Sequence, residues 1–118
     1  HDNYDASLLK SASAEARLVD QAATLAARGE WPAFAALDAK LAAVPWTSMW
    51  SRRVQQLRAI AREAAGKEAT DPASKRAALR DAQSILDRLC IAVSNCEYSE
   101  LRRKVHAELS ESEDPPGG

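Results

Sequence analysis

The sequence predicts an all-α protein, a single-domain bundle of four to five helices arranged as antiparallel helical hairpins. Alanine is its commonest residue, and together with Leu, Arg, Glu and Gln it fills the chain with strong helix formers. β-Branched and aromatic residues do not cluster as a strand requires. Turn-forming residues then divide the chain into five helical segments. They fall at positions 29–32, 44–48, 66–72 and 94–97.

The first segment is expected to be a helix from about residue 14 to residue 28, or from as early as Asp5, ended by Gly29 in a left-handed conformation. The second begins at Pro32, which belongs in a first helical turn, and is stopped by Pro45. Both have apolar residues three or four positions apart, which is typical of an amphipathic helix. These are Leu18, Ala22 and Leu25 in the first segment and Phe34, Leu37, Leu41 and Val44 in the second.

The third segment has the clearest helical period, an apolar stripe that steps by three or four residues. Thr47 or Ser48 is expected to cap this helix, and Gly66 is expected to end it before a polar linker at residues 67–70. The stripe consists of Trp46, Trp50, Val54, Leu57, Ala61 and Ala64.

Asp71 and Pro72 predict a sharp start for the fourth helix, as an N-cap followed by a proline in the first turn. Asn95, which tolerates the left-handed conformation, is expected to end it. The fifth helix is expected from about Glu97 to Leu109. The predicted buried faces are Ala78, Leu79, Ala82, Ile85, Leu86, Leu89 and Val93 on the fourth helix and Tyr98, Leu101, Val105 and Leu109 on the fifth.

One helical domain is expected over residues 1–110, followed by a disordered tail at residues 111–118 that is acidic and ends in Pro and Gly. The net charge of -1 provides no overall field for a polyanion, so nucleic acid is not expected as a partner. No apolar run approaches the roughly 20 residues that span a bilayer, and no membrane span is expected.

Cys90 and Cys96 are the only cysteines. On one continuous helix they would point to nearly opposite faces, whereas a turn at Asn95 makes them the pair that usually forms an apolar contact in a Schellman-type helix ending. A structural disulfide is therefore favoured, with two free buried thiols as the alternative. A disulfide suits a periplasmic or secreted protein, and a cytoplasmic location stays open.

No catalytic residue, metal site or cofactor is predicted, and the chain is not expected to be an enzyme. His1 and His106 are the only histidines, no Glu-x-x-His pair is present, and no Gly-rich loop precedes a helix to hold phosphate. If His1 is the native N-terminus, its amine and imidazole could chelate copper together with His106. The alternative is a residue left by a purification tag.

The three tryptophans provide the candidate site. Trp31, Trp46 and Trp50 lie at helix starts or turns, and Arg53 follows in the same part of the chain. Exposed Trp beside Arg is the composition of a protein-binding hot spot, so these four residues are predicted to contact a partner. The alternative is that the tryptophans close the end of the bundle over its core.

The segment Leu25–Leu37, with Gly29, Glu30 and Trp31 at its turn, resembles the hairpin of FliT-like flagellar export chaperones and also tetratricopeptide-type hairpins. The resemblance implies a small helical protein that binds partners, although Pro32 and the cysteine pair fit neither pattern. We therefore expect a non-catalytic helical module, an adaptor or a secretion or assembly chaperone, that binds another protein or peptide. A sensor or carrier domain for a small ligand or metal is the alternative.

Overall fold

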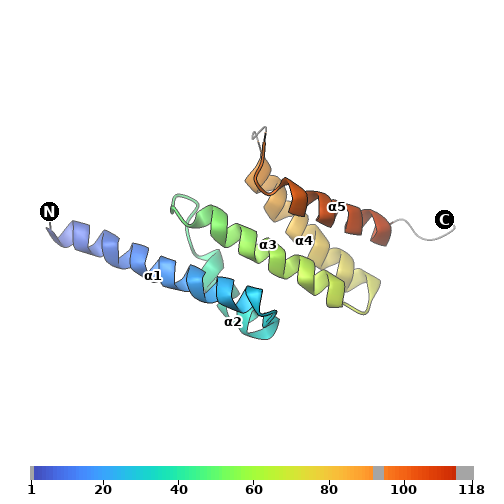
Figure 1. Cartoon of the computed structure of the whole chain (residues 1–118), viewed down its shortest axis with the longest axis horizontal. Coiled ribbons are helices and arrows are strands. Elements are labelled where there is room, and N and C mark those ends of the chain that lie inside the picture. Colours follow the sequence, from blue (N-terminus) through green and yellow to red (C-terminus); the bar gives the residue numbers. More distant parts are fainter. Residues whose placement is uncertain (1, 92–94, 114–118) are drawn as a thin grey trace. The chain divides into compact units, whose positions relative to one another are not determined.

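The protein is all-α in the computed structural model, which describes residues 2–91 and 95–113, and the side-chain surroundings of residues 13–91 and 95–112. Within these residues it forms five helices and no strand (Figure 1), which confirms the predicted fold class. The chain is divided into two compact units, with the boundary between Val54 and Gln55 near the start of α3. The single domain predicted over residues 1–110 stays a prediction. The helices are α1 (Asp2–Ala27), α2 (Trp31–Ala42), α3 (Ser51–Glu68), α4 (Pro72–Cys90) and α5 (Ser99–Glu113).

In the first unit, α1 and α2 form a helical hairpin (Figure 1). Gly29 ends α1 with a φ of 68°, the left-handed conformation that the sequence predicts. The N–H of Glu30 donates to the carbonyl of Leu25 at 2.9 Å, and the N–H of Gly29 donates to Ala26 at 3.1 Å. This is the Schellman pattern, which satisfies the last carbonyls of α1 and turns the chain into α2. Among the residues of this unit whose side-chain surroundings are described, 13–54, the buried ones are Val19, Ala22, Phe34, Leu41, Val44, Ser51 and Val54.

In the second unit, α3 from Gln55 onward packs with α4 and α5. Asp71 caps α4 as predicted, because its carboxylate accepts a 2.9 Å hydrogen bond from the N–H of Ser74. A continuous apolar core joins the helices, and Cys90 belongs to it. The core consists of Ala59 from α3, Leu79, Ala82, Leu86, Leu89 and Cys90 from α4, Tyr98 just before α5, and Val105 and Leu109 from α5.

The buried face of α4 differs slightly from the predicted one. Ala78 and Ile85 are only half-buried, whereas Leu79 and Leu86 are fully buried as predicted. The apolar stripe of α4 is wide enough to face the core in two orientations that differ by one residue position. Packing against α3 and α5 selects the orientation in which Leu79, Ala82 and Leu86 are buried. Val93 lies outside the described residues.

Gly66 does not end α3, which continues to Glu68. A Cβ atom at this position would lie 2.9 Å from both Cγ and Cδ2 of the Leu79 side chain. The glycine is therefore a point of close approach between α3 and α4, and the linker expected at residues 67–70 begins two residues later. The predicted helix end is wrong because glycine marks both helix ends and tight helix contacts in a sequence.

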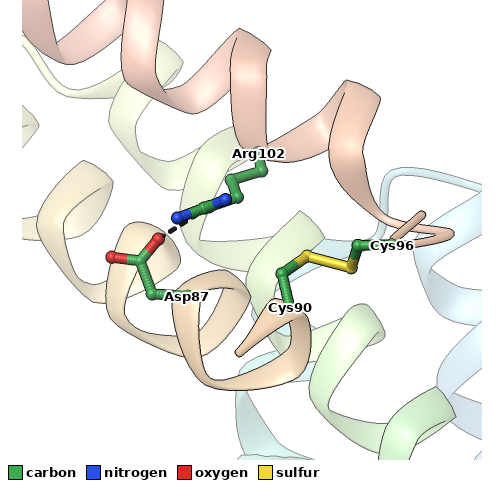
Figure 2. Close-up of a disulfide and its surroundings, with 4 residues drawn as sticks. All are labelled: Asp87, Cys90, Cys96 and Arg102. Atoms are coloured by element: carbon green, nitrogen blue, oxygen red, sulfur yellow. Dashed lines mark hydrogen bonds and ion pairs between the residues drawn. A yellow bond between two sulfur atoms is a disulfide. The ribbon is translucent and has the colours of Figure 1, made fainter. Parts of the chain in front are cut away.

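Cys90 and Cys96 form a disulfide with a Cα–Cα distance of 5.3 Å, as predicted (Figure 2). The expected helix end at Asn95 is wrong, because α4 stops at Cys90 and Ile91 has an extended backbone. Cys90 is thus the last residue of α4, and Cys96 lies three residues before α5. The disulfide therefore links the end of α4 to the segment just before α5. The Schellman-type helix ending that the sequence suggested does not explain it.

The last helix agrees with its predicted buried face, with Tyr98, Val105 and Leu109 buried and Leu101 half-buried. α5 continues to Glu113, so residues 111–113 of the expected disordered tail are helical. Ser110, Glu111 and Ser112 interrupt the apolar period without a helix breaker, and Pro115 is the first residue that cannot extend a helix. The remaining residues of the expected tail, 114–118, lie outside the described part of the chain.

Candidate functional site

The candidate site is the connection between α2 and α3, residues 43–50, called here the α2–α3 turn. The sequence predicts that Trp50 lies in the first turn of a helix capped by Thr47 or Ser48, but α3 begins only at Ser51. The N–H of Ser48 donates to the carbonyl of Pro45 at 2.9 Å, and the N–H of Ser51 donates to Ser48 at 3.1 Å. These two successive backbone turns replace the first helical turn that the sequence predicts.

Ser48 anchors this turn to α1. Its hydroxyl donates a 2.7 Å hydrogen bond to Oε1 of Glu15 and accepts one of 3.1 Å from the N–H of Trp50. Glu15 lies 33 positions earlier in the chain, so the contact is tertiary. A loop whose backbone and hydroxyl groups are bonded in this way is ordered before any partner arrives.

The turn exposes large apolar side chains in spite of this order. Trp46 is 38% exposed and Met49 is 80% exposed. Among the described residues only one other large hydrophobic side chain is exposed, that of Ile91 in the second unit. Two of three such side chains therefore lie within four residues of one turn, and clustered exposed apolar groups are typical of interaction sites.

The four predicted contact residues have different surroundings. Trp50 is half-buried, and its buried indole Nε1 has no hydrogen-bond acceptor among the described residues. Arg53 is exposed in the first turn of α3. Trp31 is half-buried and packs edge-on against Phe34, with ring centroids 5.7 Å apart. The structure therefore brings Trp46, Trp50 and Arg53 into one short stretch.

Trp31 lies apart from that stretch. It is the first residue of α2, whereas the α2–α3 turn follows the last one. A helix of 12 residues is about 18 Å long, so the two places are at opposite ends of α2. The contact with Phe34 gives Trp31 a packing role, which is the alternative stated for the tryptophans.

Sequence reasoning missed Met49. It is the only methionine of the chain, and its position between Trp46 and Trp50 in a turn could have identified it. A methionine on the buried face of a helix would belong to an apolar stripe with a period of three or four residues, whereas Met49 lies in the second of the two backbone turns, between Ser48 and Ser51. Its flexible thioether side chain is common at surfaces that bind varied partners.

A groove between α1 and the end of α2, called the α1–α2 groove, lies beside the turn. Its volume is about 440 Å³. Glu15 belongs to its wall and also binds Ser48, so the groove and the α2–α3 turn share a residue. Both lie entirely within the first unit. The groove is lined by Ala14, Glu15, Arg17, Leu18 and Gln21 of α1 and by Lys40, Ala43 and Val44.

Basic side chains lie at both the groove and the turn. Arg17 and Lys40 line the groove, and Arg52 and Arg53 follow the turn. The acidic residue of the groove, Glu15, is engaged by the hydroxyl of Ser48. This combination of an apolar floor and a basic rim favours a ligand that has apolar and acidic groups.

The residues that sequence analysis considered for metal binding are not brought together. His106 is exposed on α5, where its Nδ1 lies 2.7 Å from Nε2 of Gln83, and His1 lies outside the described residues. Across the described ranges, no group of three or more His, Cys, Asp or Glu side chains is placed to hold a metal ion. In the same ranges, no helix has the length and apolar character needed to cross a bilayer.

Comparison with known proteins gives no relative. No protein-family model, no curated protein and no solved structure matches this chain. The similarity of the segment Leu25–Leu37 to export-chaperone hairpins therefore stays a prediction from the sequence. The α2–α3 turn and the α1–α2 groove are the features of the described residues that bear on function.

Proposed function

We propose that this chain is a non-catalytic helical module that binds another polypeptide through the α2–α3 turn and the α1–α2 groove. The observation that carries the proposal is the exposure of Trp46 and Met49 on a turn that Ser48 holds in place. A rigid loop loses little conformational entropy on binding, so apolar side chains displayed on it contribute more of their burial energy to affinity. Adaptors and chaperones of secretion or assembly belong to this class.

The partner segment that fits best combines aliphatic or aromatic residues with Asp or Glu. Its apolar residues cover Trp46 and Met49 and enter the groove beside Leu18 and Val44. Its carboxylates meet the basic rim formed by Arg17, Lys40 and Arg53, which increases the rate of association and fixes the orientation of the bound segment. Trp50, the half-buried last residue of the turn, supports this surface.

We further propose that the protein works in an oxidising compartment, the periplasm or the exterior of the cell. The Cys90–Cys96 disulfide supports this, because the cytosol keeps most thiols reduced. The proposal is tested by trapping free thiols in intact cells with an alkylating reagent. We expect both cysteines to resist alkylation unless a reductant is added first, and rapid alkylation of both without reductant would contradict an oxidised pair in vivo.

Selection of random peptides displayed on phage, with the whole chain immobilised, tests the binding proposal. We expect enriched peptides to contain both apolar and acidic residues. The double variant Trp46→Ala/Met49→Ala should bind them at least about tenfold more weakly, which corresponds to the loss of about 1.4 kcal/mol. Circular dichroism should remain helical, because neither side chain belongs to the core.

Ile91→Ala is the matched control, since Ile91 is 74% exposed but lies in the second unit. Its affinity for the selected peptides should equal that of the original chain. Failure to enrich any peptide, or an equal loss of affinity in the control and in the double variant, would contradict a site at the α2–α3 turn. Loss of helicity in the double variant would assign both residues to the fold instead.

A further inference from the structure

Glu63 is a buried carboxylate in the middle of the second unit. Its side chain is 7% exposed, and two lysines approach it from the surface. Nζ of Lys104, on α5, donates to Oε1 of Glu63 at 3.4 Å, and Nζ of Lys67, one turn further along α3, lies 3.4 Å from Oε2. Burying a carboxylate is costly unless it is paired, and these long contacts compensate that cost only in part.

A second carboxyl group completes this cluster. Glu108 lies one turn after Lys104 on α5 and is within hydrogen-bonding reach of Glu63. Oε2 of Glu63 and Oε2 of Glu108 are both buried, and neither accepts a hydrogen bond among the described residues, since the contact of Lys67 with Oε2 of Glu63 is an ion pair without hydrogen-bond geometry. Two carboxylates only accept hydrogen bonds, so they satisfy each other only when one of them carries a proton.

We propose that the carboxyl group of Glu108 keeps a proton and donates it to Glu63, and that this hydrogen bond fastens the C-terminal half of α5 to α3 as a pH-sensitive latch. The donated proton links the two carboxyl groups. It also removes the repulsion between two negative charges held at the same helix contact.

The pKa of Glu108 is consistent with this arrangement. Burial raises it above the usual range of a glutamate, and the neighbouring Glu63 raises it further. Lys67 and Lys104 act in the opposite direction and lower it in part. The proton is therefore bound more tightly in the folded protein than in the unfolded chain.

The other charged groups around the latch are already engaged or lie beyond it. From α4, Asp81 pairs with Arg62 of α3 at 3.8 Å. A separate cavity near the end of α5 is lined by Asp71 and Lys75 of the α4 start and by Glu111 of α5. The groups that face Glu108 are thus Glu63 and Lys67 from α3 and Lys104 from its own helix.

The start of α5 is held differently from its C-terminal half. Cys96, three residues before the helix, is tied covalently to the end of α4, and Arg102 donates to Asp87 at 2.8 Å (Figure 2). Neither of these contacts involves Glu63 or Glu108. A change of pH therefore acts on the part of α5 from Lys104 onward, while the beginning of the helix stays in place.

The direction of the effect follows from the raised pKa of Glu108. A group that binds its proton more tightly in the folded state contributes its full stabilisation below the unfolded pKa and loses it as the pH rises through the folded pKa. The latch is closed in mild acid and loosens toward neutral and alkaline pH. Most carboxylates in folded proteins, whose pKa values are lowered, have the opposite effect.

Carbon-13 NMR of the glutamate side-chain carboxyl groups in the whole chain tests the latch without any substitution. We expect Glu108 to titrate above the usual pKa range of a glutamate side chain. A titration of Glu108 within or below that range would overturn the proposal, because a proton donated to Glu63 requires a raised pKa.

The variant Glu108→Gln tests the mechanical consequence, since its amide supplies a permanent donor to Glu63. The thermal midpoint of the original chain should fall more than that of the variant between about pH 5 and about pH 8. Glu111→Gln is the control and should retain the pH dependence of the original chain. An unchanged pH dependence in Glu108→Gln would overturn the proposal, and the NMR titration decides the matter if that variant does not fold.

Discussion

The two units of the molecule are built from the same kind of helix but are held together by different means. In the second unit a disulfide, the Arg102–Asp87 pair and the Glu63 cluster reinforce a continuous apolar core. In the first unit, the hydrogen bond between Ser48 and Glu15 fixes a turn, and that turn exposes Trp46 and Met49. The polar contacts of the second unit thus stabilise its core, whereas those of the first unit hold a turn that exposes apolar side chains.

This difference supports the proposed place of partner binding. An apolar side chain left exposed reduces solubility and gives no folding energy, so a chain that orders such side chains gains nothing from them in isolation. We propose binding in the first unit for that reason.

The largest expected effect comes from truncating a core side chain in either unit. Leu86→Ala in the second unit and Leu41→Ala in the first should each cost about 3 kcal/mol, since both side chains are fully buried. Hydrogen exchange distinguishes the units. We expect Leu86→Ala to reduce protection in α4 and α5, and Leu41→Ala to reduce it in α1 and α2. Equal loss of protection throughout the chain in both variants would mean that the units unfold as one.

Removal of the disulfide comes next. The variant Cys90→Ser/Cys96→Ser should lose about 2 kcal/mol of unfolding free energy, because the bridge closes a short loop and restricts the unfolded chain. Urea unfolding with and without a reductant measures this. The reductant should destabilise the original chain and leave the variant unchanged. A variant as stable as the original chain would remove the covalent reinforcement from the comparison.

The two internal glycines should respond for different reasons. Gly66→Ala should cost about 2 kcal/mol, because the new Cβ would clash with the buried side chain of Leu79. This clash outweighs the higher helix propensity of alanine. Gly29→Ala should cost about 1 kcal/mol, because alanine is strained at a positive φ. Denaturant unfolding measures both. Stabilisation by Gly66→Ala would mean that α3 and α4 separate easily at this point.

The smallest expected effect concerns the cap of α4. Hydrogen bonds from Ser74 to the carboxylate lower the pKa of Asp71, so the stabilisation by this cap is present above the ordinary aspartate pKa and is lost as the pH falls through the folded value. Asp71→Asn keeps a capping side chain that does not titrate. Its stability should fall less than that of the original chain between about pH 5 and about pH 2. Parallel curves for the two proteins would exclude this contribution.

The Asp71 and Glu108 predictions have opposite signs within one unit. Acid weakens the exposed cap of α4 and strengthens the buried contact between α3 and α5. Stability measured in the acidic range therefore reports on Asp71, whose carboxylate is stabilised by hydrogen-bond donors. Stability measured toward neutral pH reports on Glu108, whose carboxyl group retains its proton.

Local features of this fold could be predicted because a few neighbouring residues determine them. The left-handed end of α1 depends on Gly29, and the start of α4 depends on Asp71 and Pro72. The helical period of the apolar residues predicted all five helices, and the spacing of Cys90 and Cys96 allowed the disulfide. For the candidate site, the sequence identified Trp46, Trp50 and Arg53 but not Met49.

The remaining features depend on contacts with distant parts of the chain. Ser48 binds Glu15 across 33 positions, and α3 starts after Trp50, not before it. Gly66 is a contact and not a helix end because Leu79 lies against it. Glu63 and Glu108 are ordinary glutamates on helix surfaces in the sequence. By itself the sequence determined the five helices and the ends that have a local signal, such as the end of α1 at Gly29 and the start of α4 at Asp71 and Pro72, since backbone conformation responds to neighbours within a turn. Only the tertiary structure decided which faces are buried and which charges meet, because those depend on packing between helices.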